Sequence, residues 1–279
     1  GILSVREGVS NVISLSGTDA DGNSLSFSIA SGEDQSLFTI TPAGSLSFVI
    51  APDFETPSDA DSDNEYEVAV EVTDGTLTDG QSLVVSVTDA FEGRVVDAPI
   101  SGASVFIDLN GNNQLDADEP SGTTDASGYF QVDSFTLPTA VVAKVVSIGG
   151  TDTKTGKALP DLALISDVPA DTTKPANVTP LTTVISAATT PEEKAQVLSA
   201  LGISGSVEEL LTSNGWAKAE AGDETAKANQ RVNQQVGLLL QTAATLTDDG
   251  DESTRVSVAL AHTVARLISA VAQSEGSVD

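Results

Sequence analysis

Cysteine and methionine are absent from the 279 residues of this chain, which contains one histidine and one tryptophan. Without cysteine the chain can form no disulfide bond, no thiolate metal site and no cysteine nucleophile. The one histidine, His262, has no recognisable partner motif, and neither a Gly-x-Ser-x-Gly elbow nor a phosphate-binding loop occurs. These absences argue against an enzyme.

Basic residues are also scarce: 12 Lys and Arg stand against 41 Asp and Glu, for a formal net charge of −29. Nucleic acids and anionic membranes bind cationic faces, so neither is an expected partner. A cation is an expected partner of so acidic a chain. No apolar run approaches the roughly 18 residues that a membrane span needs. Gly1 does not open a signal peptide, so we expect the chain to be a piece of something larger.

The charge is distributed unevenly. Residues 1–90 hold 16 acidic residues and one basic residue, residues 91–170 hold 11 and four, and residues 171–279 hold 14 and seven. Together with a change in hydrophobic period, this predicts three domains with boundaries near 90 and 170. Self-repulsion in the first would be severe unless divalent ions neutralise it.

Alternating apolar and polar residues predict short β-strands in the first two segments. In residues 1–90 the runs are separated by turns rich in Gly, Asp and Pro, which indicates an antiparallel sandwich. In the second segment, Val105 and Ile107 should face one side of a strand and Phe106 the other. Residues 140–146 read as a buried strand and residues 162–168 as an edge strand. Lys144 is expected to extend its ammonium group to solvent.

The hydrophobic period changes to that of a helix after residue 171. Thr179 before Pro180, Thr190 before Pro191, and Ser206 with Glu209 are helix starts. Longer apolar stripes begin at Val232 and Leu260. Several one-sided helices predict a bundle. Trp216 is assigned to a turn, where it packs in the core or a hinge, or stacks on a sugar.

The segment from Asp108 to Glu119 matches a twelve-residue calcium loop. Such a loop offers oxygen from positions 1, 3, 5, 7, 9 and 12, with a bidentate Glu at 12. Those positions hold Asp108, Asn110, Asn112, Gln114, Asp116 and Glu119. Position 6 is Asn113, which tolerates φ > 0. Oxygen ligands without sulfur or imidazole favour Ca²⁺; the alternative is a solvated turn rich in Asx residues.

The residues around that loop carry a family resemblance. Gly102-Ala103-Ser104-Val105-Phe106, the loop itself, and Thr124-Asp125 through Gly128-Tyr129-Phe130 resemble the B-type (SdrD B-like) repeats of bacterial surface adhesins. The resemblance covers residues 91–170 and implies a prealbumin-like β-sandwich. The Val178–Thr183 entry to the helices resembles, more weakly, that of large bacterial surface proteins.

Residues 1–90 resemble a cadherin-type repeat, in the variant found in large bacterial adhesins of the secreted, RTX type. The order of Arg6-Glu7-Gly8, Asp53-Phe54-Glu55 and the acidic turns carries the resemblance, which implies a Greek-key sandwich. It also implies calcium ligands at the C-terminal end, here Glu7, Asp53, Glu55 and Asp89, with Glu92 a further candidate. Asp19, Asp21 and Asp74 would serve the junction with a preceding repeat. The linker departs from the family pattern, because Phe91 stands where the family places Asn.

Another acidic turn contains Asp59, Asp61 and Asp63, and the sequence leaves open whether it binds calcium or is a solvated turn.

For the whole chain we expect a multidomain, mainly β protein: a cadherin-like sandwich, a prealbumin-like sandwich and a C-terminal α-helical bundle. The expected function is that of a calcium-binding structural segment of a secreted bacterial surface adhesin, in which calcium stiffens modules and joints. Neighbouring modules would be its partners. The alternative is a module of such an adhesin that binds a cell-surface glycan or protein.

Overall fold

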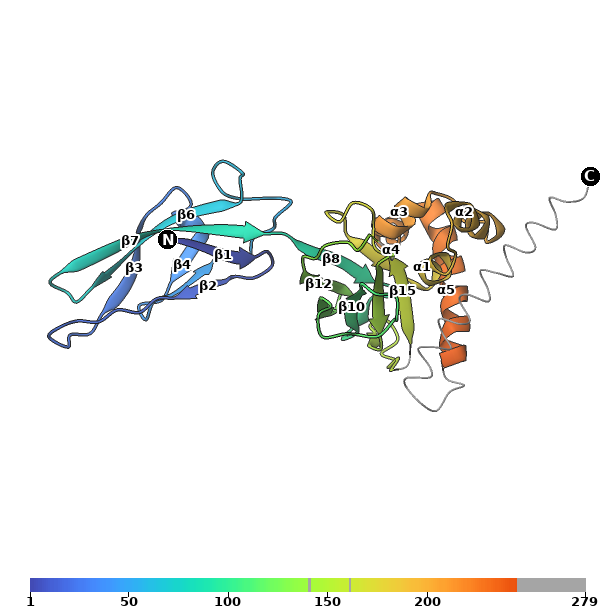
Figure 1. Cartoon of the computed structure of the whole chain (residues 1–279), viewed down its shortest axis with the longest axis horizontal. Helices are drawn as coiled ribbons and strands as arrows, with labels where there is room; N and C mark the ends of the chain where they lie inside the picture. Colours follow the sequence, from blue (N-terminus) through green and yellow to red (C-terminus); the bar gives the residue numbers. More distant parts are fainter. Residues whose placement is uncertain (140–141, 161, 245–279) are drawn as a thin grey trace, which may run out of the picture. The chain divides into compact units, whose positions relative to one another are not determined.

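The computed structural model describes residues 1–139, 142–160 and 162–244, which form two compact units that meet between Ala90 and Phe91. The described part is mainly β, with sixteen strands and five α-helices (Figure 1). None of the described helices combines the length and the apolar character that crossing a membrane requires. The second predicted domain boundary, near residue 170, is not tested by this division and stays a prediction.

The first unit contains two sheets. One has the strand order β1-β7-β6-β3 and the other the order β2-β5-β4. The strands are β1 (Ile2–Arg6), β2 (Asn11–Ser14), β3 (Ser26–Ser31), β4 (Phe38–Ile40), β5 (Ser45–Phe48), β6 (Glu65–Thr73) and β7 (Thr78–Thr88), with a 3₁₀ turn at Gln35–Leu37.

The alternation along these strands puts their apolar residues into one core. Tyr66, Val68 and Val70 of β6 are buried with Leu83, Val85 and Val87 of β7, as the period-2 pattern predicts. Tyr66 also makes an edge-to-face contact with Phe48, with ring centroids 5.0 Å apart. The predicted antiparallel arrangement is wrong at one place, because β1 pairs with β7 in parallel. The first and last strands of the unit are therefore neighbours.

The second unit begins with a β-sandwich. Its sheets have the orders β11-β10-β13-β15, β12-β8-β16 and β14-β9. The strands are β8 (Ala90–Val95), β9 (Ile100–Ser101), β10 (Ser104–Asp108), β11 (Ser121–Thr123), β12 (Tyr129–Asp133), β13 (Lys144–Ile148), β14 (Thr151–Asp152), β15 (Ala163–Asp167) and β16 (Ala176–Val178). Val105 and Ile107 lie in one buried cluster and Phe106 in another, so the predicted facing of β10 is confirmed. The predicted edge strand is β15, at one end of its sheet.

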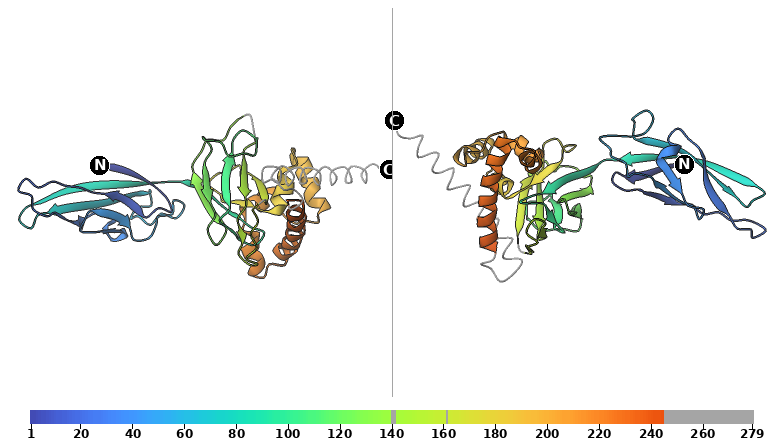
Figure 2. Two further views of the ribbon diagram at one scale, coloured as in Figure 1. Left: turned by 90° about the horizontal axis from the view of Figure 1, so that it is seen from below. Right: turned by 180° about the vertical axis from the view of Figure 1, so that it is seen from behind.

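Five helices follow: α1 (Pro180–Ser186), α2 (Pro191–Ala200), α3 (Val207–Thr212), α4 (Gly215–Glu220) and α5 (Glu224–Ala244). They gather on one side of the sheets of this unit (Figures 1 and 2). One hydrophobic cluster runs from Phe91 and Val105 through Leu181 and Val197 to Leu240. The helices therefore share a core with the sandwich.

The environments of Trp216 and Lys144 differ from those predicted. Trp216 lies on the short helix α4 rather than in a turn, because Asn214 caps a helix there. The ammonium of Lys144 does not extend to solvent but pairs with Asp167. The helix predicted from Leu260 and the residue His262 lie outside the described residues.

Candidate metal sites

The first candidate site follows from the pairing of β1 with β7. The parallel register sets Arg6 beside Thr88, so the residues that follow, Glu7 and Asp89, leave the sheet at the same end. The Glu7 amide donates to the Thr88 carbonyl at 3.1 Å, and the Gly8 amide donates to the Pro52 carbonyl at 2.9 Å. The second bond brings the loop of Glu55 to this end of the sheet.

Three carboxylates converge there. Glu7, Glu55 and Asp89 each offer an oxygen within 4.8 Å of the others. Glu7 is 2% exposed, and its two oxygens accept the amides of Phe54 and Ala90, both at 2.8 Å. These bonds fix the Glu7 carboxylate between the loop and the end of β7. The group is a set of oxygen donors of the kind that calcium takes.

The environment of Asp89 also favours a cation. Burial raises the pKa of Asp89, and the charge of Glu7 raises it further, while a backbone hydrogen bond from Ala90 lowers it. Its Oδ1 is buried and accepts no hydrogen bond within the described residues. A buried polar oxygen without a donor is destabilising. A cation among the three carboxylates would satisfy that oxygen and screen the repulsion.

Two further acids predicted at this site are engaged elsewhere. Asp53 accepts the amide of Thr56 through Oδ1 at 2.9 Å and is not one of the three clustered carboxylates. Glu92 lies on β8 and accepts a hydrogen bond from the Tyr129 hydroxyl. Asp53 and Glu92 therefore stay predictions, and the group that the structure assembles is smaller than the predicted one.

The second candidate site is the loop between β10 and β11. Strand β10 ends at Asp108, which is 0% exposed. Its Oδ1 accepts the amides of Asn110 and Gly111 at 3.1 and 2.6 Å, and its Oδ2 accepts the amide of Asn113 at 2.8 Å. Asn113 has a φ of 57°, as its place at the sharp turn predicts. The buried Asp108 carboxylate thus organises the loop around itself.

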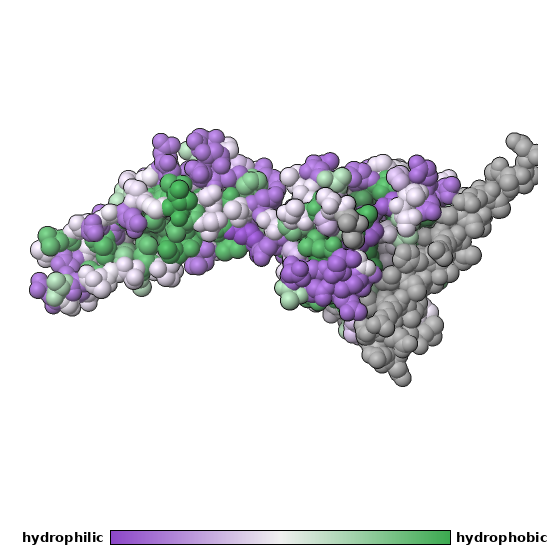
Figure 3. Space-filling model, viewed as in Figure 1, coloured by the Kyte–Doolittle hydropathy of each residue, from purple (hydrophilic) through white to green (hydrophobic). Residues whose placement is uncertain are grey.

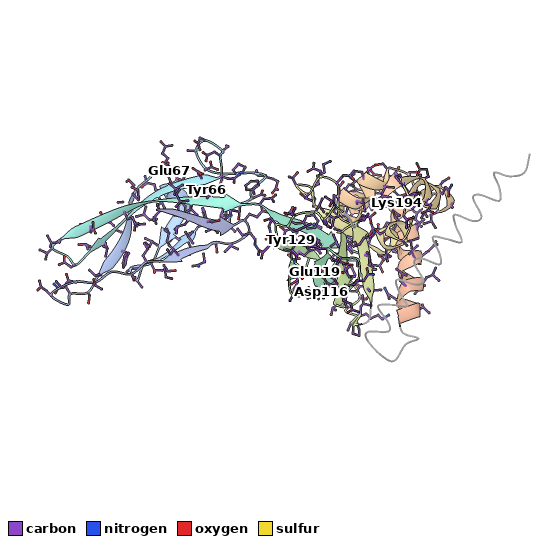
Figure 4. All side chains as sticks on the ribbon, viewed as in Figure 1. Tyr66, Glu67, Asp116, Glu119, Tyr129 and Lys194 are labelled. Carbon is purple, nitrogen blue, oxygen red and sulfur yellow. The ribbon has the colours of Figure 1, made fainter. Side chains whose placement is uncertain are left out.

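Glu119 closes the loop at its other end. It is 7% exposed, and its oxygens accept the amides of Leu109 at 2.8 Å and Asp116 at 3.1 Å. Figure 4 shows the Glu119 and Asp116 side chains close together. Positions 1 and 12 of the predicted motif thus accept backbone amides of one loop, but Asp108, Asp116 and Glu119 are not a clustered group among the described acids.

The amide side chains of the loop are arranged differently from what calcium needs. Asn110 and Asn112 both donate to Asp116 Oδ2, at 2.6 and 2.8 Å. Their own oxygens accept the amides of Asn112 and Gln114. To ligate calcium, each amide group would turn its oxygen toward Asp116. Because the same bonds occur in a turn rich in Asx residues, the calcium role of this loop stays a prediction.

The acids predicted to serve a preceding repeat form turns. Asp19 Oδ1 accepts the amides of Asp21 and Asn23 at 3.0 and 2.8 Å. Asp74 Oδ1 accepts those of Thr76 and Leu77 at 2.7 and 2.6 Å, and backbone bonds from Leu77 and then Thr76 lower the pKa of Asp74. Asp19 and Asp74 line one depression of the first unit. Among the described acids, however, Asp19, Asp21 and Asp74 are not a clustered group.

One residue that organises the first unit has no local signal in the sequence. Asp34 is 4% exposed, and its two oxygens accept the amides of Ala60 and Glu67, both at 2.8 Å. These bonds hold the loop before β6 against the sheet. Its partners lie 26 and 33 residues away along the chain, so no short motif reveals them.

The donors at both sites are carboxylate, amide and carbonyl oxygens, and the described residues include no histidine. Such donors suit hard cations, and a flexible set with several carboxylates suits calcium better than magnesium, which needs a tighter octahedron. The residues present therefore fit calcium. The clustered group of Glu7, Glu55 and Asp89 fits best, because one of its buried oxygens lacks a partner.

No family model and no curated protein matches the chain. The solved structures that resemble it include cadherin extracellular domains 3–6 of protocadherin gamma B2, at 17% identity and a TM-score of 0.26, covering 60% of this chain and 43% of that one. Human protocadherin-24 EC1-2 matches at 16% and 0.27, covering 60% and 91%. Drosophila N-cadherin EC1-4 matches at 14% and 0.27, covering 56% and 45%. Similarity at this level assigns the chain neither a family nor an activity.

Proposed function

We propose that the chain is a calcium-binding structural segment of a secreted bacterial surface adhesin, built of a cadherin-like module, a prealbumin-like B-type module and helices. Calcium holds the modules folded and stiffens the joint that follows Asp89. The observation that carries this proposal is the convergence of Glu7, Glu55 and Asp89. The resemblances of residues 1–90 and 91–170 to adhesin repeats supply the wider setting.

The charge of the first unit supports the same reading. Residues 1–90 contain one basic side chain, Arg6, against 16 acids, so side chains of this unit cannot neutralise it. Divalent ions bound at fixed places would lower the self-repulsion of the folded state. Binding that is specific to the folded state also stabilises it by mass action.

Calorimetric titration of the full chain with CaCl₂ tests this proposal. We expect Glu55→Gln to remove one bound ion, and Glu119→Ala to remove a different one, so that the losses add in the double variant. Glu33→Gln and Asp118→Asn are matched controls, because both acids are exposed and Asp118 is not at a ligand position of the loop. An unchanged ion count in Glu55→Gln would contradict the proposed site at the end of the first unit.

A second candidate function has one observation in its favour. A pocket of about 290 Å³ opens among α3, α4, α5 and β16, and Trp216, Asn177 and Asn233 are among its lining residues. An aromatic ring beside a few polar side chains is a common lining of small-ligand pockets, and a sugar is one ligand that could stack on Trp216. Lys154 lies over the Trp216 ring at 5.8 Å and would have to move for a sugar to stack there. Binding on a glycan array that Trp216→Ala abolishes would favour this ligand-binding module; no glycan binding would remove it.

A further inference from the structure

The loop that leads into β6 holds a second group of acids in the first unit. Asp59, Asp61 and Asp63 each offer a carboxylate oxygen within 4.8 Å of the others. The loop projects from the sheet in Figure 1, and this region is hydrophilic in Figure 3. Asp61 and Asp63 are exposed, whereas Asp59 is 6% exposed.

The buried member of the group is the informative one. Asp59 Oδ2 accepts the amide of Asp63 at 2.8 Å, but Asp59 Oδ1 is buried and has no hydrogen-bond partner among the described residues. An anionic oxygen that is removed from water and receives no donor destabilises the fold. Exposed acids in a solvated turn would not explain a carboxylate buried in this way.

The loop is held in place by contacts outside the acidic group. Asp34 accepts the Ala60 amide, and the Ser58 amide donates to the Tyr66 hydroxyl at 3.2 Å. Figure 4 shows Tyr66 at the start of β6. These contacts hold the backbone of the loop at Ser58 and Ala60, on either side of Asp59.

No side chain of the first unit other than Arg6 carries a positive charge. The two acidic groups of this unit contain six carboxylates, so one guanidinium cannot neutralise both. A bound cation would balance the charge of the group.

We propose that the Asp59–Asn64 loop is a calcium site, separate from both sites described above, with Asp59, Asp61 and Asp63 as its carboxylate ligands. Asn64 Oδ1 is a further buried oxygen of this loop that accepts no hydrogen bond in the described structure. Backbone carbonyls and water complete the six to eight oxygens that calcium takes. Calcium there would hold the loop against β6.

The ion count of the full chain tests this site in about 0.15 M KCl, which screens weak binding to exposed acids. We expect Asp61→Asn with Asp63→Asn to lower the number of calcium ions bound by one, in both the parent and the Glu119→Ala background. Glu55→Gln should leave this ion bound, which separates the site from the one at the end of the unit. Asp79→Asn, an exposed acid of the same unit, should leave the count unchanged.

Terbium luminescence gives a second measurement, because an excited tyrosine transfers energy to a nearby terbium ion. Tyr66 bonds to Ser58, next to Asp59, and is one of two tyrosines in the chain. Tyr66→Phe should weaken the tyrosine-sensitised signal, and Asp61→Asn with Asp63→Asn should weaken both this signal and the calcium count. An unchanged calcium count in that double variant, with its circular dichroism preserved, overturns the proposal. An equal loss in Asp79→Asn would also overturn it, because the binding would then be diffuse.

Discussion

Asp97 lies between Val96 and Ala98 in the turn after β8, where it is partly buried against α5. Burial raises its pKa, and repulsion from Asp152 raises it further, to about 6, although a hydrogen bond from Gln241 lowers it. Its Oδ2 accepts that bond at 3.2 Å, while its Oδ1 has no partner among the described residues. The charged form of Asp97 is therefore disfavoured in the folded protein.

The stability of the second unit should fall as pH rises through this range. Below the unfolded pKa of 3.8, Asp97 is protonated in both states and has no effect; above about 6 it is charged in both, and the folded state bears the full penalty. We expect Asp97→Asn to raise the free energy of unfolding by about 2–3 kcal/mol at about pH 7.5 and by only about 0.5 kcal/mol near pH 4. Urea denaturation at the two pH values measures this, with Asp118→Asn as the control. A gain that is equal at both values would point to packing instead of charge.

Several elements meet at a buried ion network in the second unit. Asp167 at the end of β15 pairs with Lys144 of β13 and with Lys194 of α2, and Lys144 also donates to the Ser186 carbonyl at 3.0 Å. The side chains are 6%, 20% and 17% exposed. The network thus ties the sheet to the end of α1 and to α2.

Removing the shared anion should be more damaging than removing the whole network. Burial raises the pKa of Asp167, but Lys144 and Lys194 together lower it by more. This stabilisation is therefore present above the unfolded pKa and is lost as pH falls through the folded one. We expect Asp167→Ala to lower the free energy of unfolding by about 3–5 kcal/mol, because two buried ammonium groups are left without a partner.

The control is the joint replacement of Asp167, Lys144 and Lys194 by Leu, Met and Met. It should recover most of the lost stability, because well-packed apolar residues can replace a buried ion network. If the triple variant is no more stable than Asp167→Ala in chemical denaturation, the network is not the source of the loss.

The helix starts could be predicted from the sequence because they depend on contacts within one turn. Thr179 and Thr190 cap α1 and α2 with complete capping boxes. Ser206 caps α3 through the Glu209 amide. The strand faces were also predictable, since the alternation of apolar residues is local. The helix that carries Trp216 is only six residues long and starts at an Asn cap, and so short a helix has little apolar periodicity to distinguish it from a turn.

Contacts between distant residues could not be predicted. The parallel pairing of β1 with β7 joins residues more than 80 positions apart, and the partners of Lys144 lie on other elements. At the candidate site, Glu7, Glu55 and Asp89 were named only through a family resemblance. The register of β1 and β7 explains why Glu7 and Asp89 meet. The resemblance also implied Asp53 as a ligand, but Asp53 is not one of the three clustered carboxylates.

At the scale of the whole molecule, chelation should affect both stability and shape. Calcium at a hundredfold excess over Kd would stabilise the folded state by about 2.7 kcal/mol, which corresponds to a rise in Tm of about 5–10 °C for a protein of this size. We expect EGTA to lower the Tm by that amount and to broaden the distribution of distances in small-angle scattering. Magnesium should restore little of either.

The variants described above separate the contributions. If chelation lowers the Tm of Glu55→Gln as much as that of the parent, and the scattering does not change, calcium does not stiffen the joint. The 108–119 loop and the Asp59–Asn64 loop would then account for the whole effect, and Glu119→Ala combined with Asp61→Asn and Asp63→Asn would abolish it.

The pairing of β1 with β7 has a consequence for a chain under tension. A force that pulls residue 1 away from residue 90 draws the two strands lengthwise in opposite directions, because they are parallel and loaded at opposite ends. The hydrogen bonds along the register from Ile2–Val84 to Arg6–Thr88 then bear the load together, whereas a hairpin pulled at its open end gives way one bond at a time. Glu7 and Asp89 follow the two strands directly, so an ion held by both would join the segments that the force slides apart.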